Sequence, residues 1–337
     1  MSTRRAQPKR YRSADTLPLA LVSGAALLIP WLFLFLSTLA YASSPYEVTD
    51  SFGKHQFEAP PQRVVVTDWT LLEQLLSLGV VPVGAPEIEA YEAFDQHTLV
   101  PDSVLDIGLR RAPSFDAIRA LEPDLIILGT DQKDLERAFS RIARVMYFHN
   151  FSERFASNGE KAMERLSQLS VLFQKEEQGD ALNASVSDHL DLQRARLEAY
   201  FLGEPPQVTI VRPLATGKVI AYGENSLLGY VSDRLGLGRA LSQDKNKLGE
   251  VAVSSSVLSK LDRGYLLVIN SADSTRLPTM ERRLPLTVGA GAQQWDATKF
   301  PKLKVIEIDD LWPYGGAAAL ASMADIISYA LLQRRGD

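Results

Sequence analysis

Residues 104–128 have the sequence VLDIGLRRAPSFDAIRALEPDLIIL, which predicts a strand, a loop, a helix and a second strand. The apolar run that opens this stretch ends at Gly108, and Pro113 and Ser114 mark the start of a helix. Arg110 lies between the first strand and the helix, and open α/β sheets bind ligands at the carboxyl ends of their strands. We therefore expect a βαβ unit with a ligand-binding residue in its first turn.

Strands and helices alternate on both sides of this unit, which predicts an α/β fold with a parallel sheet covered on both faces. Residues 43–178 form the first α/β lobe in this interpretation. Residues 179–202 form a single long helix of about 20 residues, roughly 30 Å long, which is enough to bridge two lobes. Residues 203–337 repeat the alternation and form the second α/β lobe.

Residues 1–42 are predicted to be a signal peptide or an N-terminal membrane anchor. Five basic residues precede an uncharged, strongly apolar segment that begins at residue 16. The small residues Ala40 and Ala42 fit a signal-peptide cleavage site. The uncharged run also exceeds the roughly 20 residues that span a bilayer, so an anchor that includes residues 16–42 stays open. Both alternatives place the rest of the chain in the periplasm, because the basic flank stays cytoplasmic.

Charge and composition exclude several functions. The leader carries five of the 36 basic and one of the 41 acidic residues, which leaves the rest of the chain with 31 against 40 and a net charge of −9. Such a chain is a poor match for nucleic acid. It has no cysteine, and its four histidines lack the spacing of metal ligands, so we expect neither a disulfide nor a protein metal site.

An enzyme is not expected, because the sequence has no phosphate-binding loop, dinucleotide fingerprint or nucleophile elbow. The remote alternative is a membrane-tethered periplasmic hydrolase that uses Ser226, at a strand-to-helix turn, as its nucleophile. A helix N-cap formed by Asn225 or Ser226 explains that turn equally well.

Several motifs resemble those of the periplasmic substrate-binding proteins of ABC importers for iron–siderophore complexes, haem and cobalamin. The class-wide motifs are VTDSFG (48–53), LGVVPVG (78–84), PSFDAI (113–118) and LEPDLI (121–126). Three further stretches are similar to the ferric hydroxamate binders within that class: VPDSVLDIGLR (100–110), YGENSLL (222–228) and WPYGG (312–316).

The resemblance implies two α/β lobes joined by a long helix, with a ligand cleft between the lobes. It implies that the protein captures a ferric siderophore of the hydroxamate type and delivers it to an inner-membrane ABC permease with its ATPase. The chelator, and no protein side chain, would hold the iron, so no cofactor is expected, and the protein would be a monomer. A haem or catecholate-siderophore binder of the same fold is the alternative.

The resemblance also implies ligand-binding roles for particular residues. Arg110 matches the arginine that contacts hydroxamate oxygens, a task suited to a planar, permanently charged guanidinium. The matching aromatic residues of the cleft are Phe94, Trp312 and Tyr314. Two positions depart from the family, because Gln132 replaces a ligand-contacting tyrosine and Leu248 replaces a cleft tryptophan. Among other aromatic residues, Tyr222 and Trp295 are the candidates to compensate.

Two acidic residues are expected to dock the permease, because the family uses one carboxylate on the outer face of each lobe. Asp116 matches the position in the first lobe. In the second lobe serines replace the usual acid, and Glu250 is the substitute candidate.

Overall fold

The computed structural model describes residues 45–94, 98–214, 217–239, 246–270, 297–309 and 311–333. The chain from Pro45 onward packs as one unit. The predicted leader, residues 1–42, lies outside the described residues. In the described ranges no helix combines the length and apolar character needed to cross a membrane.

The first sheet is parallel throughout and has the strand order β5-β4-β3-β8-β9. Its strands are β3 (Val64–Val66), β4 (Gly84–Ala85), β5 (Leu105–Asp106), β8 (Leu125–Leu128) and β9 (Arg144–Tyr147). Successive residues of a strand point to opposite faces. Val64 and Val66 pack against helices α2 (Trp69–Ser77) and α6 (Asn158–Leu172), whereas Val65 packs with residues of α4 (Phe115–Ala120) and α5 (Glu136–Phe139). The predicted parallel sheet with two covered faces is confirmed for this half of the chain.

The 104–128 stretch forms the expected strands and helix, with two differences. β4 and β3 lie between β5 and β8, so its strands are not sheet neighbours. The loop before α4 (Phe115–Ala120) also contains a small antiparallel hairpin, β6 (Gly108–Leu109) and β7 (Ala112–Pro113). Strands this short lack a detectable period in the sequence. Arg110 lies in the turn of this hairpin.

The second sheet is mixed, which corrects the expectation of parallel strands in both halves. Its order is β13-β11-β10-β14-β15, with β12 also paired to β10. β11 is antiparallel to β10, because only a short turn joins these two strands, and it is also antiparallel to β13. The strands are β10 (Gln207–Pro213), β11 (Lys218–Tyr222), β12 (Gly238–Arg239), β13 (Glu250–Ser254), β14 (Tyr265–Ile269) and β15 (Lys304–Ile308).

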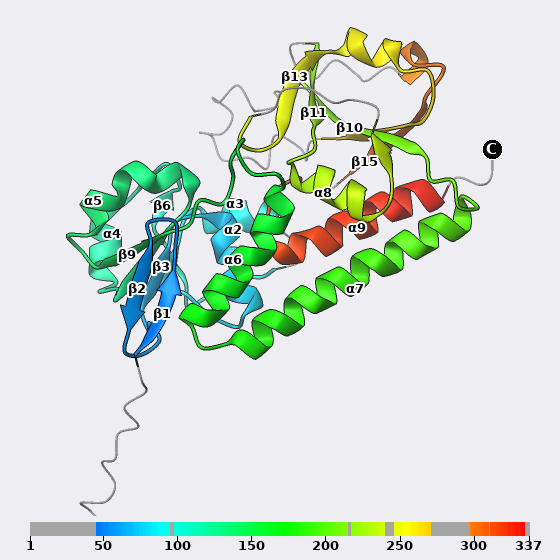
Figure 1. Ribbon diagram of the computed structural model, residues 1–337. Helices are drawn as coiled ribbons and strands as arrows, with labels where there is room; N and C mark the ends of the chain where they lie inside the picture. Colours follow the sequence, from blue (N-terminus) through cyan, green and yellow to red (C-terminus); the bar gives the residue numbers. More distant parts are fainter. Residues whose placement is uncertain are drawn as a thin grey trace, which may run out of the picture. The chain divides into compact units, whose positions relative to one another are not determined.

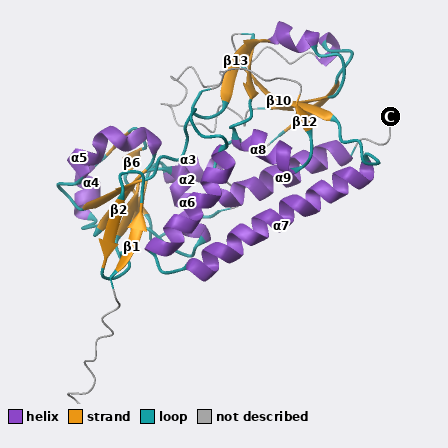
Figure 2. Cartoon of the chain, viewed as in Figure 1, coloured by secondary structure: helices purple, strands orange, loops and turns teal. Residues whose placement is uncertain are grey.

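Helices separate the two sheets, and Figure 2 shows the strands in two groups with α2, α6, α8 and α9 between them. The remaining bounds are β1 (Tyr46–Thr49), β2 (Lys54–Phe57), α2 (Trp69–Ser77), α3 (Ile88–Phe94), η2 (Thr130–Leu135), α5 (Glu136–Phe139), α6 (Asn158–Leu172), α8 (Leu227–Arg234), η3 (Ser255–Lys260), η5 (Ala297–Lys299) and α9 (Ala317–Leu332).

The predicted long helix is α7 (Glu176–Tyr200), which begins three residues earlier than expected and has 25 residues. It lies beside α9 along much of its length (Figure 1). At its start Gly179 packs on Ser170 of α6, where a Cβ would lie 2.5 Å from the serine Cβ. After its end Phe201 contacts Tyr265 of the second sheet. The helix therefore connects the two halves, as the sequence indicated.

A buried carboxylate fixes the start of α9 against α2. Glu73 of α2 is 4% exposed, and its two oxygens accept hydrogen bonds from the N–H groups of Gly316 (2.7 Å) and Ala319 (3.0 Å). These donors belong to the first turn of α9, where N–H groups lack partners within the helix and negative charge is favourable. Gly315 has a φ of +134°, and a Cβ on it would lie 2.7 Å from a Glu73 oxygen. The contact therefore requires glycine at this position.

A second joint lies at the start of α6. The N–H of Asn158 donates to the carbonyl of Asn225 at 3.0 Å, and the Asn158 amide donates to the carbonyl of Lys247 at 2.9 Å. Asn225 in turn donates to the carbonyl of Ser152 at 3.2 Å. Both asparagines are almost fully buried, at 1% and 0% exposed. Amide side chains that both donate and accept can join three backbone segments at one point.

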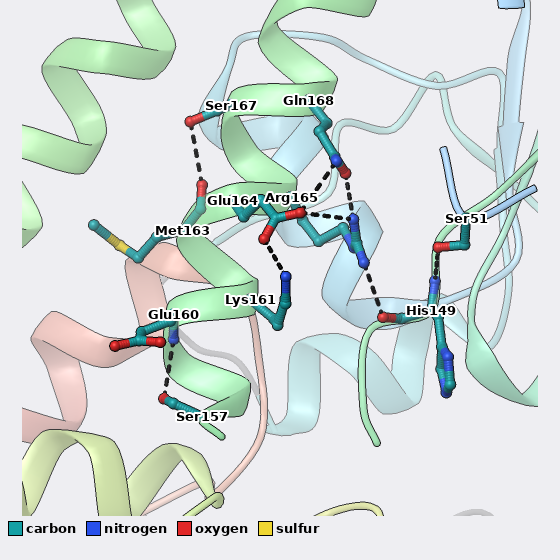
Figure 3. A network of polar contacts seen from close by, with 10 residues as sticks. All are labelled: Ser51, His149, Ser157, Glu160, Lys161, Met163, Glu164, Arg165, Ser167 and Gln168. Carbon is teal, nitrogen blue, oxygen red and sulfur yellow. Dashed lines mark hydrogen bonds and ion pairs between the residues drawn. The ribbon is translucent and has the colours of Figure 1, made fainter. Parts of the chain in front are cut away.

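The segment between β9 and α6 is held from two sides by a polar network (Figure 3). The N–H of His149 donates to the Ser51 hydroxyl at 2.8 Å, and the His149 carbonyl accepts from Arg165 of α6 at 3.2 Å. Arg165 also donates to Gln168 and lies 3.7 Å from Glu164. The path from the first sheet to α6 is thereby fixed.

We predict that Glu73→Gln lowers the free energy of unfolding by about 1–3 kcal/mol, because one of two buried N–H donors loses its acceptor. Urea denaturation followed by circular dichroism would measure the change. Glu153→Gln, at an exposed loop position, is the control and is expected to change stability by less than about 0.5 kcal/mol. Equal stability of wild type and Glu73→Gln would contradict the anchoring role.

Candidate ligand-binding site

Arg110 is presented by a hairpin at the carboxyl end of β5. Gly108 adopts a φ of +88°, and its N–H donates to the Asp106 carboxylate at 2.6 Å, which sets the turn into the hairpin. Gln132 lies underneath at 2% exposed and donates from its amide to the Arg110 carbonyl at 3.1 Å. Gln132, which was noted above as a departure from the resembling family, therefore supports the backbone of the hairpin.

The Arg110 guanidinium is held by a carboxylate and by an aromatic ring. Its Nε donates to the Glu87 carboxylate at 2.6 Å, and its Cζ lies 3.5 Å from the ring centroid of Trp69. The arginine side chain remains 27% exposed. Stacking and ion pairing together fix the plane of the guanidinium.

Trp69 is a site residue that the sequence analysis missed. It begins α2 directly after the N-cap Asp68, whose carboxylate accepts from the Leu71 N–H at 3.2 Å. Its indole N–H donates to the Pro86 carbonyl at 2.9 Å. The available signal was its position just after the buried strand β3, the same rule that selected Arg110.

Asp68 adds a carboxyl group next to this arrangement. It accepts from the Asn150 amide at 3.0 Å, in addition to its role as N-cap. Burial raises the pKa of the Asp68 carboxyl, while the Leu71 N–H and the charge of Arg110 act in the opposite direction. Gly129 allows the Asp68 carboxyl to pack closely against the backbone, since a Cβ at position 129 would collide with this carboxyl.

Trp312 and Tyr314 lie in the loop between β15 and α9. Trp312 lies next to Trp69, the ring on which Arg110 stacks. The ring centroids of Trp69 and Trp312 are 6.4 Å apart, and those of Trp312 and Tyr314 are 4.9 Å apart in an edge-to-face arrangement. The hydrogen bonds of Glu73 hold the end of this loop. The structure therefore brings three sequence-predicted residues, Arg110, Trp312 and Tyr314, into one continuous series through Trp69.

A buried polar cluster continues the series beyond Tyr314. Arg212 of β10 donates to the hydroxyl of Tyr222 at 3.2 Å and to that of Tyr314 at 3.3 Å. The Tyr314 hydroxyl donates to Glu250, whose carboxylate lies 3.7 Å from the Arg212 guanidinium. Burial raises the pKa of Tyr222 well above its ordinary value, and burial with the charge of Tyr222 and Glu250 does the same for Tyr314.

This cluster corrects the expected docking role of Glu250. The residue is 3% exposed and its carboxylate is bonded to Tyr314 and paired with Arg212, so it is unavailable to a partner on the outer face. The reason is its place on β13, which pairs with β11 and directs Glu250 inward next to Tyr222. Tyr222 itself is 8% exposed and belongs to the core, with its hydroxyl directed to Arg212.

The remaining residues that the sequence singled out do not belong to the series around Arg110 as the structure describes it. The side chain of Phe94 and the whole of Trp295 lie outside the described residues. Leu248 is half-buried in the loop before β13. Asp116 lies on α4 with its side chain 96% exposed and pairs with Arg119 at 3.1 Å. Its docking role stays a prediction.

Two further features bear on chemistry. Ser226 is 1% exposed and its hydroxyl caps α8 by accepting from the Gly229 N–H at 2.8 Å, which confirms the N-cap interpretation. Across the described ranges, no cluster of histidine, aspartate and glutamate could hold a metal ion.

Comparison with known proteins identifies the family. The sequence profile of the periplasmic binding proteins matches residues 64–282, which is well over half of the chain. The chain belongs to the periplasmic binding protein family. It shares 23% identity over 280 residues with the iron(3+)-hydroxamate-binding protein FhuD of Escherichia coli K12, covering 82% of this chain and 89% of FhuD.

Solved structures agree with this assignment. The siderophore-binding protein FhuD of Vibrio cholerae, in its crystal structure with Fe3+–Desferal, has 34% identity and a TM-score of 0.68, covering 80% of this chain and 98% of its own. The petrobactin-binding protein YclQ of Bacillus subtilis has 22% identity and a TM-score of 0.65, covering 86% and 99% of the two chains, and shows the shared fold. These relatives are binding proteins, as expected for this family, and not enzymes.

We predict that Tyr314→Phe lowers the free energy of unfolding by about 1–3 kcal/mol at pH 7, because Glu250 loses a donor inside the protein. In the wild type, the tyrosines with raised pKa keep their protons in the folded state but lose them near pH 10 in the unfolded state. Stability therefore falls as the pH rises above about 10.

In Tyr314→Phe this alkaline decline should be shallower, because one titrating group is missing. Urea titrations from pH 7 to 11 would measure both effects. Tyr329→Phe, with a side chain on the exposed surface of α9, is the control at pH 7 and is expected to change stability by less than about 0.5 kcal/mol. If stability declined as steeply above pH 10 in Tyr314→Phe as in the wild type, the contribution of Tyr314 to this decline would be refuted.

Proposed function

We propose that this protein captures a ferric siderophore of the hydroxamate type outside the inner membrane and delivers it to an ABC permease. The observation that carries the proposal is the stacked guanidinium of Arg110, 3.5 Å from Trp69, in one series with Trp312 and Tyr314. An arginine N–H fork can donate to the metal-bound oxygens of a hydroxamate complex. Aromatic rings can contact the organic shell of the chelator.

The chemistry of the site supports binding without removal of the iron. A ferric complex keeps its metal only if no stronger protein ligands lie nearby. The side chains next to Arg110 include the Trp69 ring, the Gln132 amide and the Glu87 carboxylate, which already pairs with the arginine. The chelator would therefore retain the iron, and the protein would recognise the outer surface of the complex.

The relatives support the same ligand class. FhuD of Escherichia coli is named for iron(3+)-hydroxamate binding, and the Vibrio cholerae structure holds Fe3+–Desferal. Relatives with other ligands belong to the same family, among them the Fe(3+) dicitrate-binding protein FecB. The hydroxamate assignment to this chain is therefore a proposal that requires a binding test.

We predict that the full chain, kept in mild detergent, shows saturable quenching of tryptophan fluorescence by ferrichrome and ferrioxamine, since Trp69 stacks on Arg110 and Trp312 lies next to Trp69. Arg110→Ala should weaken binding by roughly 10- to 100-fold, as expected for loss of a charge-assisted hydrogen bond of about 1.5–3 kcal/mol.

Arg111→Ala removes the same charge from the adjacent, exposed position and is the matched control, with an expected change below about threefold. Quenching by haemin or ferric enterobactin with no response to either hydroxamate would contradict the ligand class. Equal losses in both arginine variants would contradict the role of Arg110.

We also propose that Asp116 contributes to permease docking, because its side chain is almost fully exposed on α4, the helix that follows the Arg110 hairpin. Asp116→Asn should reduce uptake of radioactive iron from ferrichrome in vesicles with the permease and its ATPase, while the Kd for ferrichrome stays unchanged. Asp188→Asn, an exposed acid on α7, serves as the control. Normal uptake by Asp116→Asn would exclude this role.

A further inference from the structure

The guanidinium of Arg110 is not a bare positive charge. Its Nε donates to the Glu87 carboxylate at 2.6 Å, and the two side chains are only 27% and 13% exposed. Water screens such a pair less than an ion pair on the open surface, so the charges largely cancel for a ligand that approaches the arginine. A hydrogen-bond donor is retained, but the attraction for a negative ligand is reduced.

The position of Glu87 is imposed by the same hairpin that presents Arg110. Glu87 has a φ of +50°, which a residue with a side chain rarely adopts. Its N–H donates to the Gly108 carbonyl at 3.0 Å, and the next N–H, of Ile88, donates to Asp106 at 2.8 Å. These two adjacent N–H groups thus tie the Glu87 segment to Gly108 and Asp106. Such strained backbone persists only where its surroundings enforce it.

The second guanidinium in the series has the same arrangement. Arg212 is paired with Glu250 at 3.7 Å, with side chains 13% and 2% exposed. Each of the two arginines nearest to the aromatic series therefore faces a carboxylate. Glu87 is the more exposed of the two carboxylates and pairs with the more exposed arginine, whereas Glu250 is almost fully enclosed.

We propose that Glu87 determines charge selectivity: by neutralising Arg110, it favours ferric complexes without net negative charge over anionic ones. The inference rests on the proposed function and deepens it. Three hydroxamate groups carry three negative charges and cancel those of Fe3+, so the complex is neutral, whereas a tris-catecholate complex remains triply negative. A carboxylate beside the contacting guanidinium repels the second kind of ligand and leaves the first almost unaffected.

Glu87→Gln is the direct test, because glutamine keeps the size and an oxygen that can accept from Arg110 Nε while the charge is removed. Kd values for ferrichrome and for ferric enterobactin would be measured on the full chain by fluorescence titration at low and at physiological salt. We expect the affinity for ferric enterobactin relative to ferrichrome to rise by at least about tenfold. The gain should shrink with added salt.

Glu89→Gln is the matched control, since it removes the same charge from an exposed position in the first turn of α3, the helix that follows Glu87. Its affinity ratio should stay within about threefold of the wild type. Should Glu87→Gln fail to fold, the double variant Glu87→Gln/Arg110→Gln carries no unpaired charge at this site. Compared with Arg110→Gln alone, which leaves Glu87 unneutralised, the double variant should again favour the anionic complex.

The outcomes separate this inference from the proposed function. A wild type that binds ferrichrome, with equal affinity ratios in wild type and Glu87→Gln, overturns the selectivity role alone. A wild type that binds neither hydroxamate overturns both proposals. A tenfold shift in Glu89→Gln as well would show that overall charge, and not the Arg110 pair, controls the ratio, and would also refute the inference.

Discussion

The buried carboxylate of Glu73 determines how the two halves of this protein meet. It accepts hydrogen bonds from Gly316 and Ala319 and so fixes the first turn of α9 against α2. The same helix α2 begins with Trp69, and the loop before α9 carries Trp312 and Tyr314. One interaction therefore sets the separation of rings that come from opposite ends of the sequence. It thereby contributes to the fixed geometry of the aromatic series next to Arg110.

Several connections restrict relative motion of the halves. The long helix α7 packs along α9, the start of α6 is bonded to Asn225, and Lys247 pairs with Asp131. The last two connections join a segment of the first half to one of the second, and the first holds the linking helix against the second half. A receptor with such joints loses little conformational entropy when it binds a rigid chelate, because its site is already organised.

The arrangement of charge is as informative as the arrangement of rings. Both guanidinium groups near the aromatic series have a carboxylate partner, and both pairs are mostly buried. Arginine suits this position because its planar fork can stack on a ring, pair with an acid and still offer further N–H donors. The site thereby combines directional hydrogen bonding with low net charge, which is appropriate for a bulky neutral complex.

The sequence by itself determined the α/β class and the long helix, and it predicted Arg110, Trp312 and Tyr314 as candidate ligand-binding residues. These depend on local patterns: apolar runs, glycine and proline boundaries, and motifs of a few adjacent residues. Local patterns could not reveal that β4 and β3 separate β5 from β8, or that β11 is antiparallel to β10.

Only the tertiary structure decided the partners. Glu87 meets Arg110 across 23 residues, and Glu73 meets Gly316 across 243. The tertiary structure also encloses Glu250, which the sequence suggested as a docking residue on the outer face. Strand pairing in the sheet directs its carboxylate inward. Hydrogen bonds and burial between segments distant in sequence depend on the packed chain, and no local period or motif records them.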